Sequence, residues 1–422
     1  MSDTTTGATA STDGGGLETP APRLKRLKIN KFRNVRPTEL VFDDDWNVLL
    51  GRNGTGKTTL LELIAATIRG DVRAFEDVDY DLEAEISLGP AQVKWTVKTE
   101  EPTGLAEGVK LDLPTAIVRS AQRRFRAELS GENLRSNVFT GDEHGIDKLA
   151  GVQATSRAGA TALFLLMIAI GHIGASLKEQ NFLRAMDAAL LSADVQRFDE
   201  ILTFFQRITP NGELTLSSKP TGQILASGDL VKAFRESAQS KDERVLIEHQ
   251  KLPFLRRFVD LCGFSSASLH LELLRRESSK KKSIASFGRP SFLFRRRNGE
   301  ELREQHLSYG QKRLLAFLYY LTISNPVVAD ELVDGLHFDW IKACVEETRG
   351  RQKFFASQNP LLVDHMGFKT RDAVKSRFIR CSLEGDEMVW SNFSDAEADD
   401  FFVAYRTGIQ AVSEVLRQKG LW

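Results

Sequence analysis

The chain has 422 residues, of which 41% are hydrophobic and 27% are charged, a composition typical of a soluble globular protein with one large domain or two ordinary ones. Lys and Arg together number 57, as do Asp and Glu, so no overall field steers the chain toward nucleic acid or a membrane. The three cysteines lie far apart without a CxxC pair, which argues against a disulfide framework or a cysteine zinc site and predicts a cytoplasmic location.

The N-terminal segment has almost no large apolar side chains. Residues 1–22 are mostly Thr, Ser, Gly, Ala and Pro, and such a segment cannot offset its ordering entropy, so we expect a disordered tail. No apolar core follows positive charges there, so no secretory signal is expected. The most apolar stretch, residues 162–173, is interrupted and too short to span a bilayer, and a buried helix is the better interpretation.

Periodicity predicts the elements that follow the tail. Strands are predicted at residues 24–32, 39–42, 46–50, 82–86, 92–97 and 115–118. A glycine-rich turn at 51–56 follows the third strand, and apolar residues at helical spacing from Leu60 to Ile68 then predict a helix.

The second half of the chain starts with a different pattern. Residues 158 to about 276 have mostly helical periodicity without sustained heptads, so no coiled-coil arm is expected. The elements predicted beyond them are a strand at 291–294, a helix from 312 to about 323, strands at 327–329 and 353–356, and an amphipathic helix at 396–418.

The strongest local motif is Gly51-Arg-Asn-Gly-Thr-Gly-Lys57-Thr58, which fits G-x-x-x-x-G-K-[ST] between a buried strand and a helix. Glycines let backbone N–H groups wrap phosphates at the helix N-terminus. Lys57 is placed to reach the β- and γ-phosphates, and the Thr58 hydroxyl to hold Mg²⁺. The residues predicted to bind nucleotide here are Asn53, Gly54, Thr55, Gly56, Lys57, Thr58 and Thr59.

Two further motifs complete a nucleotide site. The apolar run 327–329 ends in Asp330 and Glu331; Asp330 would reach Mg²⁺, and Glu331 would orient and polarise the attacking water. Just upstream, Leu307-Ser308-Tyr-Gly310-Gln311 begins a predicted helix and forms a second anion site. A single P-loop does not need this second site, so the motif predicts a contact across an interface between chains.

The order of P-loop, LSYGQ and Asp-Glu resembles that of ABC ATPases, where LSGGQ-like motifs contact the γ-phosphate of ATP held by the opposite subunit. The segments 29–34, 51–62 and 330–337 further resemble the SMC/RecF branch, which includes OLD-like ATPases often found in bacterial defence systems. The resemblance covers roughly residues 24–75 and 300–365.

The resemblance implies an ABC-type α/β P-loop fold with a mixed central sheet and an antiparallel N-terminal strand layer. The implied segments are a tail at 1–22, core halves at 23–157 and 286–395, a mainly helical insertion at 158–285 and a C-terminal helix at 396–422. It also implies ATP and Mg²⁺ as cofactors and a head-to-tail dimer or higher oligomer. Ser308, Gly310 and Gln311 would then contact the ATP bound by Lys57 and Thr58 of the other copy.

The resemblance assigns roles to further residues. Arg33 and Asn34 would lie near the nucleotide, and Asp334 in the loop that couples the two sites. Gln122 follows a predicted strand and could sense Mg²⁺ and the γ-phosphate, although any exposed glutamine after a strand looks the same. Gln358 stands where the family usually has a switch histidine. Glutamine cannot take up a positive charge, so either hydrolysis is slow or one hydrogen-bonding switch residue replaces another.

We expect the regulatory ATPase subunit of an anti-phage defence system, controlling a separate effector such as a nuclease or toxin. This is a class-level inference. The alternatives are a RecF- or SMC-like DNA repair factor and an ATP-stabilised scaffold with little turnover. An ABC transporter subunit is disfavoured because the insertion separates the motifs and no membrane segment is predicted.

Two surface features stay open. Basic clusters at 275–276, 280–282 and 295–297 could contact a DNA backbone, or could be solvated loop and strand faces. The apolar periodicity at 401–416 could dock a partner or pack on the chain's own core. Histidines are few and scattered, so no metal site is expected beyond the nucleotide-bound magnesium.

Overall fold

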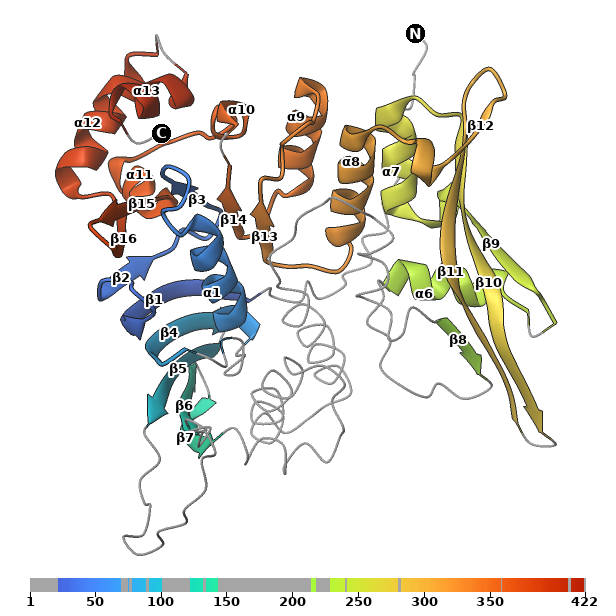
Figure 1. The fold of residues 1–422 in the computed structure, drawn as a ribbon, viewed down its shortest axis with the longest axis horizontal. Helices are drawn as coiled ribbons and strands as arrows, with labels where there is room; N and C mark the ends of the chain where they lie inside the picture. Colours follow the sequence, from blue (N-terminus) through green and yellow to red (C-terminus); the bar gives the residue numbers. More distant parts are fainter. Residues whose placement is uncertain are drawn as a thin grey trace, which may run out of the picture.

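A computed structural model of the chain describes most of residues 22–142 and most of residues 214–420 (Figure 1). The described residues are 22–69, 75, 78–88, 91–100, 122–131, 134–142, 214–217, 228–239, 241–279, 282–357, 359–408 and 411–420. The predicted strand at 115–118, the apolar stretch at 162–173, Gln358 and nearly all of the predicted tail lie outside these ranges. So does the predicted boundary at residues 157 and 158.

The central sheet has the strand order β13-β14-β3-β15-β16. Its strands are β3 (Trp46–Leu50), β13 (Val327–Asp330), β14 (Lys353–Ala356), β15 (Phe378–Glu384) and β16 (Glu387–Asn392). The first four in this order are parallel, whereas β16 pairs antiparallel with β15. The sheet is therefore mixed, as predicted, and combines strands from both ends of the chain.

Both faces of the central sheet are buried, which explains why β3 and β13 read as short continuous apolar runs. Side chains alternate between two cores: Val48 and Phe355 face one, whereas Leu49 and Phe354 face the other. The second of these cores also contains α1 (Lys57–Arg69), which packs between the central sheet and a second sheet.

The second sheet is antiparallel, with the order β2-β1-β4-β5-β6-β7. Its strands are β1 (Arg23–Phe32), β2 (Thr38–Val41), β4 (Tyr80–Leu88), β5 (Ala91–Glu100), β6 (Gln122–Gly131) and β7 (Leu134–Asp142). This confirms the predicted antiparallel layer. Charged residues of neighbouring strands pair on its outer face, where Arg26 contacts Glu39 at 2.6 Å and Glu85 at 3.0 Å, and Lys28 contacts Glu83 at 2.9 Å.

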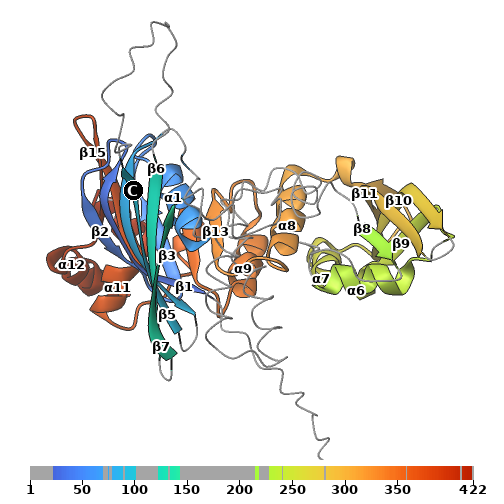
Figure 2. The same ribbon diagram turned by 90° about the horizontal axis from the view of Figure 1, so that it is seen from below.

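A third sheet lies at the opposite end of the molecule (Figures 1 and 2). It has the order β12-β11-β10-β9, and β8 also pairs with β11. Its strands are β8 (Leu214–Ser217), β9 (Arg244–Glu248), β10 (Ser266–Ser279), β11 (Lys282–Arg295) and β12 (Glu301–Arg303). The helices of this part are α6 (Gly228–Ser237) and α7 (Pro253–Cys262), with a single 3-10 turn at His249–Lys251.

The third sheet corrects two sequence predictions. The described part of the expected helical insertion contains three complete strands and the start of a fourth, because β10 and β11 pair along a long hairpin. The expected boundary between residues 285 and 286 falls inside β11, so it does not separate two structural units. The sheet packs through an aromatic core in which Phe258, Phe264 and Phe294 contact one another with centroid separations of 5.2 to 6.0 Å.

Two helices lie between this sheet and the central one: α8 (Tyr309–Tyr320), preceded by a 3-10 turn at Glu304–His306, and α9 (Phe338–Glu347). In both views they lie between the β9–β12 sheet and β13 (Figures 1 and 2). Helix α8 begins three residues before the predicted position because Ser308 caps it.

The C-terminal part consists of α10 (Pro360–Val363), α11 (Arg371–Arg377), α12 (Asp395–Arg406) and α13 (Val412–Gln418). The single helix predicted at 396–422 is therefore two described helices, α12 and α13. Phe401 of α12 is fully buried against Phe378 and Phe393, and Val415 and Leu416 of α13 are also buried. Much of this apolar periodicity is thus used to pack on the chain's own core.

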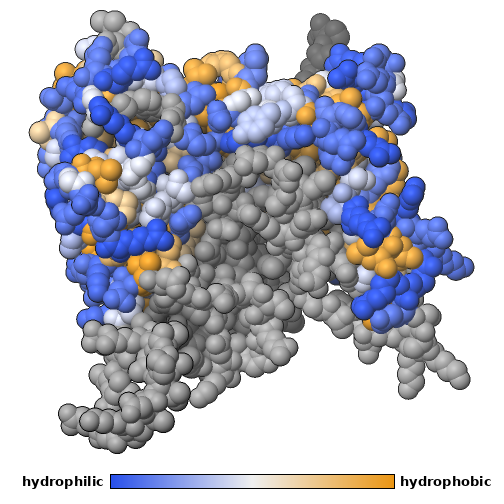
Figure 3. Space-filling model, viewed as in Figure 1, coloured by the Kyte–Doolittle hydropathy of each residue, from blue (hydrophilic) through white to orange (hydrophobic). Residues whose placement is uncertain are grey.

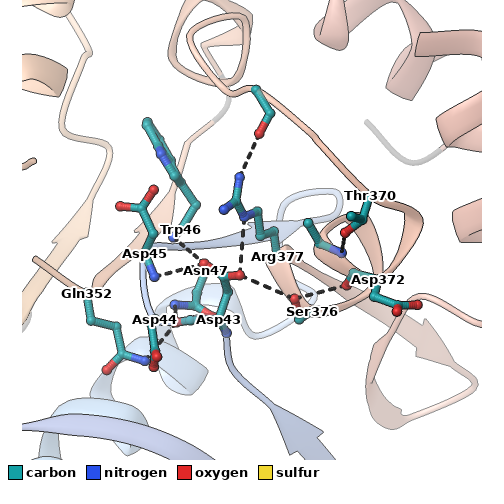
Figure 4. Close-up of polar contacts among 12 residues, drawn as sticks. Asp43, Asp44, Asp45, Trp46, Asn47, Gln352, Thr370, Asp372, Ser376 and Arg377 are labelled. Carbon is teal, nitrogen blue, oxygen red and sulfur yellow. Dashed lines mark hydrogen bonds and ion pairs between the residues drawn. The ribbon is translucent and has the colours of Figure 1, made fainter. Parts of the chain in front are cut away.

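A polar network sets the start of β3 (Figure 4). The Asp43 carboxylate accepts hydrogen bonds from the N–H groups of Asp45 at 2.8 Å and Trp46 at 3.3 Å. Asn47 accepts from the Asp43 N–H at 2.9 Å, and Arg377 of α11 pairs with the Asp43 carboxylate at 3.3 Å. The network ties the entry of β3 to the C-terminal helices, at the end of the strand away from the glycine-rich turn.

The face seen in Figure 1 is mostly polar wherever its residues are described, with small separate apolar patches (Figure 3). Within the described ranges, no helix combines the length and apolar character needed to cross a membrane.

Candidate nucleotide-binding site

The turn between β3 and α1 forms a closed loop of backbone. The Lys57 ammonium donates to the carbonyl oxygens of Gly51 at 2.9 Å and Arg52 at 3.0 Å, and the Thr55 hydroxyl donates to Arg52 O at 2.8 Å. Gly56 has a φ of +83°, a conformation that other residues rarely adopt. The predicted P-loop is therefore a cradle at the N-terminus of α1, the place that favours phosphate.

A hairpin far along the chain closes this loop from outside. The indole N–H of Trp390 donates to Thr55 O at 3.1 Å from a fully buried position. A Cβ at Gly56 would lie 2.4 Å from Met388 Sδ. Sequence reasoning missed Met388 and Trp390; the only signal was the apolar alternation of β16, which does not indicate what the strand packs against.

The thiol next to the loop is not reactive. Burial raises the pKa of Cys381 on β15 to about 12, while the nearby Lys57 acts in the opposite direction. The Cys381 thiol therefore stays protonated at neutral pH. The backbone carbonyl oxygen of Cys381 packs closely on the loop, and a Cβ at Gly51 would lie 2.1 Å from it.

Thr58 and Asp330 meet although 272 positions separate them in the sequence. The Thr58 hydroxyl donates to Asp330 Oδ2 at 2.7 Å. Strands β13 and β3 are both parallel neighbours of β14, so their carboxyl ends lie at the same edge of the sheet. A hydroxyl beside a carboxylate at the foot of a phosphate cradle fits Mg²⁺, which usually takes only one or two protein oxygens together with water and phosphate.

Glu331 follows directly and has an unusual backbone. Its φ is +48°, which is uncommon for a residue with a side chain and is frequent at functional sites. Its N–H donates to Ala356 O at 2.9 Å, and its carbonyl oxygen accepts a hydrogen bond from Arg313 of α8. Arg313 is the third residue that sequence reasoning missed in this site.

These groups line one pocket of about 560 Å³. Its lining residues are Asn53, Gly54, Gly56, Lys57, Thr58, Thr59, Arg313, Asp330, Glu331 and Met388. The structure thus brings together the cradle, the predicted metal-binding pair and the predicted general base. Thr55 is buried in the loop beneath the pocket and does not line it.

The LSYGQ motif lies outside this pocket. Ser308 caps α8 by accepting from the Gln311 N–H at 3.2 Å, while Gln311 Oε1 accepts from the Ser308 N–H at 2.9 Å. Ser308 is exposed, and Gly310 is buried against the loop after β13, where a Cβ would lie 2.5 Å from Gly335 O. Ser308, Gly310 and Gln311 therefore do not line the pocket beside the chain's own P-loop.

Arg33 and Asn34 lie beside the pocket rather than in its lining. The Asn34 carbonyl accepts from the Met388 N–H at 2.9 Å, and its side-chain amide donates to Asp386 O. The Arg33 guanidinium lies 5.4 Å from the Phe32 ring centroid. The segment therefore flanks the pocket through Met388.

The other two predicted residues gain no support from the site. Gln122 begins β6 opposite Glu100 on the antiparallel sheet, and Gln358 lies outside the described residues. Both assignments stay predictions. Across the described ranges, no group of three or more His, Cys, Asp or Glu side chains is placed to hold a metal ion.

Comparisons with known proteins agree with this geometry. A family model described as an AAA domain matches residues 26–136. The DNA replication and repair protein RecF of Haemophilus influenzae is 51% identical over 41 residues, which are 10% of this chain and 11% of that protein. RecF of Actinobacillus pleuropneumoniae is 35% identical over 83 residues, 18% of this chain and 22% of that protein.

Over this core, the chain resembles the SMC/RecF-like ABC-type P-loop ATPases. The matches to the two curated RecF proteins span only about a tenth and a fifth of their length, so this statement concerns the core alone.

Solved structures of the same branch resemble the chain at low identity. The SMC head domain from Thermotoga maritima matches with 13% identity and a TM-score of 0.36, over 88% of this chain and 99% of that one. The recombination mediator protein RecF bound to ATPrS matches with 12% identity and a TM-score of 0.31, over 89% and 99%. The likeness to an ATPase core therefore comes from the sheet order and the motif positions described above, and not from these two structures.

Proposed function

We propose that this chain binds Mg-ATP in the pocket beside α1 and hydrolyses it between two copies of itself. The observation that carries the proposal is the 2.7 Å contact between Thr58 and Asp330, with Glu331 next to them on the same pocket wall. This contact supports the proposal because the side chains proposed to bind phosphate, hold the metal ion and act as the base lie at one edge of the sheet.

Each side chain has a role in this proposal. Lys57 and the backbone N–H groups of the loop hold the phosphates, and Thr58 and Asp330 hold the magnesium ion with its water shell. When bound, the ion neutralises the charge that develops on the phosphoryl oxygens. Glu331 orients the attacking water and accepts its proton.

The second half of the site comes from another copy. Ser308 and Gly310 form an anion-binding helix start that does not line the pocket of its own chain. A head-to-tail dimer would place this helix start on the γ-phosphate held by the partner. ATP then joins the two chains, and hydrolysis separates them.

The output we propose is regulatory: the ATP-dependent dimer is the sensor subunit of a bacterial anti-phage defence complex and controls a separate effector such as a nuclease. The support is the motif set 29–34, 51–62 and 330–337, which resembles the SMC/RecF branch, and that branch includes the OLD-like ATPases often found in such systems.

A second candidate output is DNA repair, which the local RecF identity favours. In that case, DNA should stimulate ATP turnover, and neutralising the exposed Arg275 and Arg276 on β10 should remove the stimulation. If ATP turnover ignores DNA and both variants behave as wild type, the DNA repair candidate is contradicted. A third candidate, an ATP-stabilised scaffold, predicts a dimer with almost no turnover.

The first experiment measures the mass of the protein in solution with Mg-ATP. Glu331→Gln should form a stable ATP-dependent dimer or larger assembly, because ATP binds without being cleaved, and Ser308→Arg should abolish it. Ser394→Arg is the matched control, because Ser394 caps α12 with the same reciprocal hydrogen bonds and lies outside the site. It should assemble like wild type.

Mass that ignores ATP in all these variants would contradict the shared site. Loss of the assembly in the Ser394 variant as well would mean that a lost helix cap, rather than a lost phosphate contact, explains the Ser308 result.

A further inference from the structure

The first turn of α8 contacts the loop that follows β13 of its own chain. Tyr309, directly after Ser308, is 49% exposed, yet its ring lies so close to this loop that a Cβ at Gly335 would be 2.7 Å from Tyr309 Cδ1. Gly310 packs equally closely on the same loop. A displacement of the helix start must therefore displace the loop, because such close packing leaves no free space between the helix start and the loop.

An arginine one turn further along α8 extends this contact to Glu331. Arg313 is 3% exposed, and its Nη1 donates to the Tyr309 hydroxyl at 2.7 Å. Its guanidinium lies 5.3 Å from the Tyr309 ring centroid, and its Nη2 donates to the carbonyl oxygen of Glu331. Only a planar fork can reach both oxygens at once, so lysine would not replace it.

The carbonyl that Arg313 holds is part of a strained segment. Glu331 has a φ of +48°, a conformation that persists only when surrounding contacts impose it. Its N–H is fixed by Ala356 O at 2.9 Å and its carbonyl by Arg313. The direction of the Glu331 side chain in the pocket thus depends on Arg313 and, through it, on Tyr309.

We propose that Tyr309 and Arg313 are positioning residues that connect the LSYGQ helix start to the general base of the same chain. This rests on the proposed function, in which the partner's ATP contacts Ser308. Binding of that ATP orders the helix start and, through Tyr309 and Arg313, holds Glu331 in its productive position. Each bound ATP then prepares the opposite site for hydrolysis, which makes turnover cooperative in ATP.

Two conservative variants test the proposal. Tyr309→Phe keeps the ring and removes only the hydroxyl, and Arg313→Lys keeps the charge and removes the fork. Arg351→Lys is the matched control, because Arg351, like Arg313, donates hydrogen bonds to two oxygen atoms. These are Leu321 O at 2.6 Å and Ser324 O at 2.7 Å, and Arg351 does not line the pocket. The measurements are kcat, the Hill coefficient for ATP, the Kd for a non-hydrolysable ATP analogue and the ATP-dependent mass.

Tyr309→Phe should lower kcat up to about tenfold, the effect of one hydrogen bond that acts mainly on the transition state. It should also reduce the Hill coefficient toward one, and Arg313→Lys should lower kcat at least as far. The Kd and the ATP-dependent assembly should stay as in wild type, and Arg351→Lys should keep wild-type kcat. The double variant should be no slower than Arg313→Lys, because both residues act through one connection.

Unchanged kcat in both variants overturns the proposal. So does a weakened Kd with unchanged kcat, which would make Arg313 a direct phosphate ligand. A loss of kcat that follows a loss of assembly also overturns it. Failure of the proposed function looks different, because the wild type would then neither assemble with ATP nor hydrolyse it, and the connection to Glu331 would fail with it.

Discussion

The two proposed anion sites of this chain both lie at helix N-termini, but they are built differently. The P-loop at the start of α1 is closed by β15 and β16, more than 300 residues later in the sequence, through Trp390 and Met388. The LSYGQ site at the start of α8 is shaped by its own neighbours, Ser308 and Gln311, which cap each other. One site depends on tertiary packing, whereas the other is largely a local structure.

This difference predicts which changes should weaken ATP binding and which should weaken ATP-dependent assembly. Changes in the distant hairpin should weaken ATP binding and leave the LSYGQ helix start intact. Changes in the cap should disturb assembly and leave ATP binding to a single chain intact.

The largest effect is expected from Gly56→Ala. The new Cβ would meet Met388 Sδ at 2.4 Å, and alanine would have to adopt a φ of +83°. Such strain is worth about 1–3 kcal/mol, so ATP binding should weaken by about 10- to 100-fold in a titration.

Gly54→Ala separates the two causes. Gly54 has a similar φ of +81°, but a Cβ there has nothing within 4 Å. It should weaken ATP binding less than Gly56→Ala does. Equal losses would mean that backbone strain alone matters and that the hairpin contact contributes nothing.

Trp390→Phe tests the hairpin with a smaller change. It keeps an aromatic ring and removes the hydrogen bond to Thr55 O, which is worth about 1 kcal/mol. The Kd for ATP should rise by roughly fivefold, while the ATP-dependent mass at saturating ATP stays that of wild type. A loss of assembly at saturating ATP would contradict the separation of the two sites.

Ser308→Ala tests the local site. Loss of an N-cap costs about 1 kcal/mol of folding stability, and Ser394→Ala should cost a similar amount at α12. Only Ser308→Ala should also lower ATP-dependent assembly, with unchanged ATP binding to the single chain. Equal assembly of the two variants would show that the Ser308 hydroxyl does not contact the partner's nucleotide.

The smallest effect is expected from pH, and it extends the comparison to the sheets behind the two sites. Hydrogen bonds from Arg26 and Lys28 lower the pKa values of Glu39 and Glu83 below the ordinary 4.5 on the outer face behind the P-loop. Because the folded-state pKa values are lowered, this stabilisation is present above pH 4.5 and is lost as the pH falls below it. The sheet behind LSYGQ is packed by aromatic rings, which do not titrate.

Thermal unfolding at pH values above and below 4.5 measures this difference. Arg26→Gln should slightly reduce the acid-induced fall in Tm, because surface ion pairs contribute only about 0–1 kcal/mol. An unchanged slope would assign the acid sensitivity to other carboxylates.

Much of the site could be predicted because its chemistry uses short motifs. Lys57 and Thr58 follow the glycine turn, and Asp330 and Glu331 end an apolar run, so each pair was identifiable from its neighbours. The two pairs meet because β3 and β13 are both parallel neighbours of β14, so their carboxyl ends lie at the same edge of the sheet. Arg313, Met388 and Trp390 were missed because each acts on a backbone atom or a glycine that only folding brings near.

Apart from the strand predicted at 291–294 in β11, the third sheet was missed for a reason visible in its register. β10 alternates Leu269, His270 and Leu271 correctly, but register shifts after His270 and Leu273 change which side chains face inward. The bulges break the two-residue period, and Leu, Glu and Arg are also strong helix formers. Periodicity over a short window therefore favours a helix here.

The sequence by itself determined the two motifs that we propose hold phosphate and magnesium, because the residues within each motif are adjacent along the chain at a strand end or a helix start. It also determined the cap of α8, which is made within four residues. The tertiary structure decided how tightly the P-loop is closed and how Glu331 is held. Those contacts join β16 to α1 and α8 to β13, and the burial that makes them strong arises only after the layers have packed.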